Sequence, residues 1–200
     1  MLLRRGSRLD IPTERLTLRP PQVGDHNAWA LLRRHDRDRL QEWEPTWSRD
    51  HLSRAAFRAR VNWSRGAIDD GRALPLFLIR RQDDTLLGAI SLDNIRRGPA
   101  QSATIGYWIA GAYSGQGYMT EALAAIVHYA FTTLDLSRVE AACLPENTRS
   151  RRLLERCGFK YEGVAQSYLQ IDGRWRTHVL FANLRHDRRG RVGEPAARAN

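Results

Sequence analysis

Residues 113–123 read YSGQGYMTEAL, and residues 145–159 read PENTRSRRLLERCGF. The first stretch follows 103–110, an apolar run with β-branched and aromatic residues, and apolar residues recur at helical spacing after it. A strand therefore turns into a helix across residues 111–117. Glycines at such a turn let a ligand approach the backbone, and the free N–H groups and dipole of a helix N-terminus favour an anion. The stretch predicts a phosphate-binding turn.

Two other phosphate-binding motifs do not fit this turn. In a Rossmann turn the third glycine would fall at Thr120, and no acidic residue follows a second strand at the required distance. A Walker motif needs a lysine directly after the glycines, but the single lysine of the chain is Lys160. A glycine turn by itself often serves geometry alone. The second stretch therefore decides the interpretation.

The second stretch indicates a helix of its own. A strand over 137–144 ends at Pro145, Asn147 can cap the following helix, and Gly158 stops it. The order strand, glycine turn, helix, strand, Asn-x-x-Ser helix, Gly-Phe, strand resembles the GNAT superfamily of N-acetyltransferases. Within it the chain is most similar to the RimJ/RimL branch, which acetylates the N-termini of ribosomal proteins, and to the RimJ type. The motifs that carry this resemblance are TERLTLRP at 13–20, IGY at 105–107, PENTRS at 145–150 and YLQIDGRWRTH at 168–178.

The resemblance covers about residues 11–184 and implies an α/β fold of the GNAT type. In that fold a mixed, mostly antiparallel sheet of about seven strands is splayed at its centre and flanked by helices. The residues themselves predict two helical arms, at 25–34 and 52–68, and a hairpin turn at Asp172-Gly173. Strands are expected at 14–19, 74–81, 86–95, 101–110, 137–144, 159–171 and 174–184.

Length and composition fit one domain over 1–184, followed at 185–200 by a basic tail that we expect to be disordered. No apolar run approaches the roughly 20 residues that cross a bilayer, so we expect a cytoplasmic enzyme without a membrane partner. The 2 cysteines are too few for a disulfide framework, and the histidines lack metal-ligand spacing. The net charge of +10 leaves two interpretations open, a weak contact of the basic surface with RNA or the ribosome, or arginines spread along the chain without a binding role. Monomer and dimer both stay open.

The resemblance implies acetyl-CoA as co-substrate and no metal. The implied coenzyme contacts are Trp108, Ile109, Ser114, Gly115, Gln116, Gly117, Tyr118, Met119, Thr120, Asn147, Ser150 and Arg152. In the family the Ile109 amide would donate a hydrogen bond to the thioester carbonyl. This contact would be catalytic, since one preorganised donor to an oxyanion contributes a factor of about 10²–10³ to the reaction rate. Ser114 and Met119 depart from the family pattern, but contacts made by backbone amides tolerate both changes.

Ser150 is the expected catalytic side chain. It lies one helical turn from Asn147, and in the family this serine approaches the coenzyme sulfur. Without the family, Asn147 reads as an ordinary N-cap and Ser150 as a polar first-turn residue. Many relatives carry Glu where this chain has Thr104, so a carboxylate base is absent there. A peptide α-amine has a pKa of about 7.7–8.0, so Glu140, Glu44 or a water relay would suffice as proton acceptor. The expected acceptor contacts are Trp43, Glu44, Tyr107 and Tyr168.

The sequence therefore predicts direct acetyl transfer from acetyl-CoA to the N-terminal amine of a protein, with ribosomal proteins as the expected class. No Ser-His-Asp or Cys-His arrangement indicates a covalent intermediate. A small amine, such as an antibiotic or polyamine, is the alternative acceptor on the same fold. A noncatalytic, RNA-associated binding protein is the alternative of another class.

Overall fold

One mixed sheet forms the centre of the computed structural model, which describes residues 9–186. Within these residues the sheet has eight strands in the order β1-β2-β3-β4-β5-β6-β8-β7, and its pairings are antiparallel except between β5 and β6. The strands are β1 (Ile11–Pro12), β2 (Leu16–Arg19), β3 (Leu74–Arg80), β4 (Thr85–Arg96), β5 (Ser102–Ile109), β6 (Arg138–Cys143), β7 (Lys160–Ile171) and β8 (Arg174–Leu184). The α-helices are α1 (His26–His35), α2 (Arg37–Gln41), α3 (Arg54–Asp69), α4 (Tyr118–Thr132) and α5 (Thr148–Arg156), and 3-10 turns lie at Val23–Asp25 and Gly111–Tyr113.

The predicted fold class is confirmed. All seven expected strands are present, and β1 is an additional two-residue strand paired to β2. Both helical arms are present, and α3 begins where Ser53 caps it by accepting a hydrogen bond from the Ala56 N–H. Helix α2 was not expected, because five residues are too few to establish a helical period. Of the predicted tail at 185–200, residues 187–200 lie outside the described residues, while the Arg185 N–H bonds the Ser137 carbonyl.

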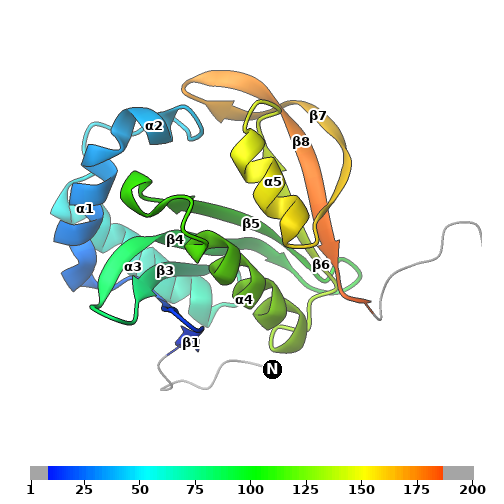
Figure 1. The fold of residues 1–200 in the computed structure, drawn as a ribbon, viewed down its shortest axis with the longest axis horizontal. Coiled ribbons are helices and arrows are strands. Elements are labelled where there is room, and N and C mark those ends of the chain that lie inside the picture. Colours follow the sequence, from blue (N-terminus) through cyan, green and yellow to red (C-terminus); the bar gives the residue numbers. More distant parts are fainter. Residues whose placement is uncertain (1–8, 187–200) are drawn as a thin grey trace, which may run out of the picture.

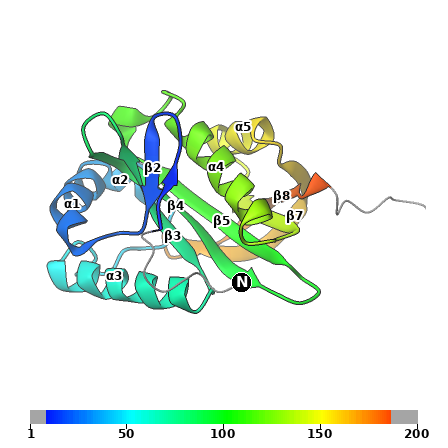
Figure 2. The ribbon, with the colours of Figure 1, turned by 90° about the horizontal axis from the view of Figure 1, so that it is seen from below.

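The helices cover both faces of the sheet, as Figures 1 and 2 show. On one face α4 and α5 enclose the larger core, which includes Leu123, Ile126 and Leu154. On the other, α1 and α3 enclose a smaller cluster around Trp29 and Phe57. Alternation along the strands sends every second side chain to each face, so the residues of the sheet can be assigned to the α4/α5 face or to the α1/α3 face.

The sheet opens between β5 and β6. These strands pair in parallel where residues 102–104 lie beside residues 138–140, and the described structure extends this pairing no further. Beyond Thr104, β5 continues along β4 while β6 continues along β8. The opening beside residues 105–109 therefore connects the two faces of the sheet. No helix in the described residues is long and apolar enough to cross a membrane.

Candidate active site

A cleft of about 1970 Å³ lies at this opening. The turn before α4 and the first half of α5 line one side, and side chains of α1, α3 and the segment after α2 line the other. Single-ligand pockets commonly have volumes of about 300–1,000 Å³. The cleft therefore has room for a long ligand together with a second molecule.

The glycine turn forms the wall at the start of α4. Gly115 and Gly117 have φ angles of +79° and +83°, in the left-handed region that favours glycine, and Gly117 is the N-cap of α4. Because a glycine cap has no side chain, the first N–H groups of the helix stay available to an anion. The side chain of Gln116 bonds back to the Ala112 carbonyl at 2.9 Å, and this predicted coenzyme contact does not belong to the cleft lining in the described structure.

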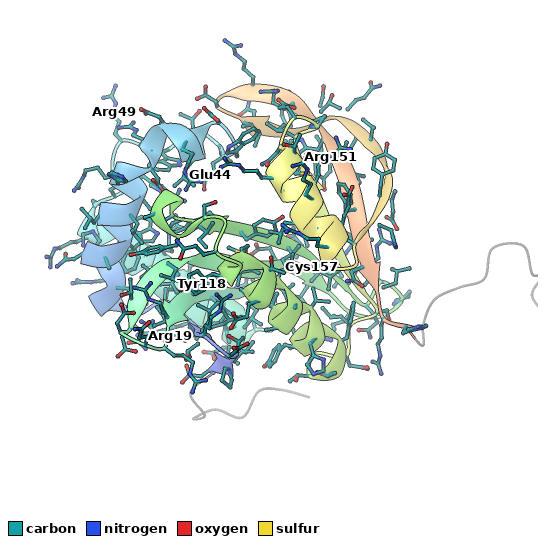
Figure 3. All side chains as sticks on the ribbon, in the orientation of Figure 1. Arg19, Glu44, Arg49, Tyr118, Arg151 and Cys157 are labelled. Atoms are coloured by element: carbon teal, nitrogen blue, oxygen red, sulfur yellow. The ribbon has the colours of Figure 1, made fainter. Side chains whose placement is uncertain are left out.

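Arg15 buttresses the turn from 101 residues away in sequence. It donates to the Gln116 carbonyl at 3.0 Å and to Glu121 at 2.7 Å, and its guanidinium lies 4.4 Å from the centre of the Tyr118 ring. Figure 3 shows Tyr118 at the beginning of α4. Arg15 thus fixes the shape of the turn and adds positive charge beside it, a role that sequence reasoning missed because nothing in the local pattern around residue 15 points to residue 116.

Hydrogen bonds aim the Ile109 amide into the opening. The Ala110 N–H donates to the Leu87 carbonyl of β4 at 2.9 Å. Because backbone groups alternate in direction along a strand, the N–H and carbonyl of Ile109 point away from β4, toward the opening. The Ile109 carbonyl accepts a bond from Arg39 at 2.6 Å. Its N–H then faces the cleft, the direction required of a donor to a ligand carbonyl.

Asp36 holds this strand end in place. The residue is 8% exposed, and its carboxylate accepts bonds from Arg39 at 2.6 Å and from the Gly111 N–H at 2.5 Å. Burial alone would raise the pKa of Asp36, but these two hydrogen bonds and the Arg39 charge hold it below the ordinary value. The carboxylate therefore remains a firm acceptor at neutral pH. Sequence analysis did not find Asp36 or Arg39, because their partners are about 70 residues further along the chain.

The start of α5 supplies a hydroxyl pair. The Asn147 side chain caps the helix by accepting from the Ser150 N–H at 3.0 Å, as the interpretation without the family predicted. Ser150 Oγ lies 2.8 Å from the hydroxyl of Tyr107 on β5. Burial raises the pKa of Tyr107 well above its ordinary value, so the phenol keeps its proton. If that proton points to Ser150, the serine proton is free to point into the cleft.

Arginine and tryptophan form the opposite wall. Arg33 is 5% exposed, and its guanidinium lies 4.3 Å and 5.0 Å from the ring centres of Trp47 and Trp108. It binds both oxygens of Glu44 at 2.8 and 2.5 Å, and the Trp47 indole N–H donates to the same carboxylate at 2.9 Å. In Figure 3, Glu44 lies on the α2 side of the cleft and Arg151 on the α5 side. Burial and the nearby Arg33 and Arg60 lower the pKa of His51 to about 4, so this wall carries a neutral imidazole.

Comparison with known proteins assigns the chain to a family. Over residues 15–160 the chain matches the family described as the acetyltransferase (GNAT) domain. The chain belongs to the GNAT family of acetyltransferases. The predicted family and the prediction of an N-acetyltransferase are both confirmed.

Relatives of this GNAT enzyme include the [ribosomal protein uS5]-alanine N-acetyltransferase of Escherichia coli, which is 35% identical over 88% of the chain and 94% of the relative. Among solved structures, RimJ of Mycobacterium smegmatis in complex with CoA-disulfide has a TM-score of 0.85 and 33% identity, covering 91% of this chain and 90% of that one. The ribosomal-protein-S5-alanine acetyltransferase of Vibrio fischeri has a TM-score of 0.83 and 26% identity, and the match covers 91% of this chain and 100% of that one. The predicted resemblance to the RimJ/RimL branch is therefore supported along almost the whole chain.

Most of the predicted coenzyme contacts of this GNAT chain line one cleft: Trp108, Ile109, Ser114, Gly115, Gly117, Tyr118, Met119, Thr120, Asn147, Ser150 and Arg152. The acceptor candidates Trp43, Glu44 and Tyr107 line it as well. The Tyr107 hydroxyl nevertheless contacts Ser150 and not the Arg33 wall. Tyr168 is 42% exposed and lies against the lining residue His178, with ring centres 5.6 Å apart.

Glu140 lies in a poor position for a base. It lies beside Thr104 on the neighbouring strand but does not belong to the cleft lining in the described structure. Its carboxylate accepts bonds from Arg96 at 3.0 Å and Arg138 at 2.7 Å, so two arginines neutralise it. The geometry therefore argues against Glu140 as the proton acceptor that the sequence allowed.

Proposed function

We propose that this GNAT enzyme transfers acetyl from acetyl-CoA to the N-terminal amine of a protein, with ribosomal proteins as the candidate class. The observation that carries the proposal is the continuous cleft, which joins an anion-binding turn to an aromatic wall across the opening of the sheet. The names and extents of the matched E. coli and V. fischeri relatives support the acceptor class.

In this proposal the turn at 114–120 holds the coenzyme pyrophosphate through backbone N–H groups at the positive end of α4. The M. smegmatis neighbour, solved with CoA-disulfide, supports a coenzyme as the ligand of this fold. The acetyl thioester then lies beside β5, where the Ile109 amide faces the opening and can donate to the thioester carbonyl. That bond strengthens as the carbonyl oxygen gains negative charge.

Ser150 and Tyr107 act on the sulfur. The hydroxyls of Tyr107 and Ser150 lie 2.8 Å apart, and burial keeps Tyr107 protonated. In this proposal Tyr107 is the donor, which leaves the serine proton to point toward the departing thiolate. The attacking amine forms the C–N bond, the C–S bond breaks with its electron pair on sulfur, and sulfur takes up a proton. The transfer is direct, so no acyl-enzyme forms.

Replacing Ser150 by Ala removes the hydroxyl that lies nearest to the proposed sulfur position. We expect the turnover number to fall about 10-fold or more while the Kd of acetyl-CoA changes little, because the hydroxyl acts on the transition state. Steady-state kinetics with calorimetric binding would check this. Tyr107→Phe is the matched variant and should lower turnover by a smaller factor. Equal turnover in parent and Ser150→Ala would leave Ser150 a helix residue only.

Glu44→Gln tests the aromatic wall. The change keeps the size of the side chain but removes the charge that an incoming ammonium would share with Arg33. We expect the KM for a peptide beginning with Ala to rise several-fold, with acetyl-CoA binding unchanged. The exposed pair Arg72–Asp70 supplies the control Asp70→Asn, which removes an ion pair outside the cleft lining. An unchanged peptide KM would place acceptor recognition at the β7–β8 hairpin.

The acceptor class is tested by thiol release from acetyl-CoA against peptides beginning with Ala, Ser, Met or Thr, beside polyamines and aminoglycosides. The proposal expects turnover of peptides, at a higher kcat/KM than any small amine. Turnover of small amines alone would contradict it. Contact with RNA stays a prediction, which retention on ribosomal RNA at moderate salt would check.

A further inference from the structure

The α1/α3 face of the sheet carries a row of polar side chains at the closed end of the opening. Asp93 of β4 lies directly beside Thr104 of β5, and Thr104 lies beside Glu140 of β6. The assignment to this face follows from alternation, since Leu92 and Ile105 belong to the core on the other face. Two carboxylates therefore flank one threonine across three strands.

The two carboxylates of this row differ in their partners. Glu140 binds Arg96 and Arg138, whereas no cationic side chain among residues 9–186 lies within ion-pairing distance of Asp93. In a chain with a net charge of +10, a half-buried carboxylate without a cation is unusual. Asp93 also lines the cleft, which Thr104 and Glu140 do not.

The other carboxylates of the cleft are less available. Glu44 binds Arg33, and Glu146 binds Arg176. Glu42, in the turn after α2, and Glu155, on α5, are exposed to solvent. Asp93 is thus the carboxylate that the sheet itself presents to the cleft without a cation to neutralise it.

Ser91 is hydrogen-bonded to Asp93 and lies nearer than Asp93 to Ile109 at the reacting end of the cleft. Its hydroxyl donates to Asp93 Oδ2 at 2.5 Å. On the neighbouring strand Ser91 lies beside Gly106, and a Cβ built on Gly106 would be 3.7 Å from Ser91 Oγ. Because Gly106 has no side chain, the surface between Trp108 and Thr104 is bare, and a small group can rest there against the serine hydroxyl.

We propose that the Ser91–Asp93 pair receives the proton of the acceptor amine. This inference rests on the proposed function, since it assigns the proton acceptor of that reaction. As the amine nitrogen gives its electron pair to the new C–N bond, it becomes cationic and releases a proton to Ser91 Oγ, directly or through one water. Ser91 passes its own proton to Asp93, and solvent removes that proton after product leaves. In this relay Ser91 contacts the substrate, and Asp93 positions Ser91 and takes up its proton.

The first test is Asp93→Asn, which keeps the shape but cannot take up a proton. With a peptide beginning with Ala, we expect kcat at pH 7 to fall roughly 10²-fold, the usual contribution of a positioned base, with the KM for acetyl-CoA unchanged. The deficit should shrink as pH rises above about 8, because hydroxide can then take the proton that the cationic nitrogen gives to the pair in the parent. A purely structural role would lower activity equally at every pH.

A second variant moves the carboxylate across the strands. Thr104 lies opposite Asp93 on the same face, and opposite residues have Cβ atoms about 4.5–5.5 Å apart. Asp93→Asn with Thr104→Glu should regain at least 10-fold of the lost kcat. Glu140→Gln is the matched control, because this carboxylate in the same row is already paired with arginines, and it should stay within two-fold of the parent.

Three results would overturn the proposal: Asp93→Asn within two-fold of the parent, a pH-independent loss, or no rescue by Thr104→Glu in a protein with parental melting temperature. If Asp93→Asn does not fold, Ser91→Ala carries the same pH test. The comparison uses whichever amine the parent acetylates best. If the parent acetylates only small amines, the proposed function is contradicted, but the same variants still test the Ser91–Asp93 pair with those amines. A parent inactive on every amine would overturn both the proposed function and the role of the pair.

Discussion

Gly117→Glu is expected to abolish coenzyme binding, with at least a 100-fold rise in the Kd of acetyl-CoA. Gly117 has a φ of +83°, which L side chains rarely adopt, and a Cβ there would be 3.3 Å from Arg15 Nη2. The added carboxylate would stand at the positive end of α4, where the pyrophosphate is proposed to bind, and would repel it. Isothermal calorimetry with acetyl-CoA measures the effect directly.

The control for this variant is Gly24→Glu. Gly24 lies in the turn before α1, and a Cβ there meets no atom within 4 Å. The same charge is thus added to the same chain away from the cleft, and acetyl-CoA affinity should stay within two-fold of the parent. A folded Gly117→Glu protein that binds acetyl-CoA as the parent does would disprove the assignment of the turn.

The sequence could predict this turn because its signal is local. Three glycines, a preceding strand and a following helix occupy one continuous stretch, and the same holds for Asn147 and Ser150 at the start of α5. The strands were equally accessible, since each carries its own alternation of apolar residues. Local signals therefore predicted both the fold class and the side of the cleft that is proposed to face the coenzyme.

The rest of the site depends on contacts between distant residues. Arg39 reaches the Ile109 carbonyl 70 residues away, and Asp36 reaches the Gly111 N–H 75 residues away. Glu44 looked like a free anion in sequence, yet folding brings buried Arg33 against it. Glu140 and Asp93 are both acidic residues on strands, and only strand pairing and nearby arginines distinguish them. A single sequence contains no record of such pairings.

Gly88→Ala should disturb this framework without touching any motif. A Cβ on Gly88 would lie 2.3 Å from the Trp108 carbonyl oxygen and 2.8 Å from the Ile109 Cα, both backbone atoms of β5. Backbone cannot rotate away as a side chain can, so β4 and β5 must separate at this point. We expect the free energy of unfolding to fall by about 3 kcal/mol, the upper part of the usual range for overpacking.

The same displacement should reach the chemistry. Moving β5 shifts the Ile109 amide from the proposed thioester carbonyl, and a misplacement of about 1 Å can lower turnover roughly 10²-fold. We therefore expect Gly88→Ala to lower kcat much more than it raises the KM of acetyl-CoA, since the turn at 114–120 is a separate segment. Thermal unfolding and steady-state kinetics on the folded fraction measure the two effects.

Gly66→Ala is the matched control for Gly88→Ala. Gly66 lies inside α3, where a Cβ meets nothing within 4 Å, so the identical change should stabilise the protein by about 0.5–1 kcal/mol through helix propensity. The two variants should thus shift the melting temperature in opposite directions. A Gly88→Ala protein with parental stability and parental kcat would mean that β5 can retreat from β4 without moving the Ile109 amide, and that this amide does not set the rate.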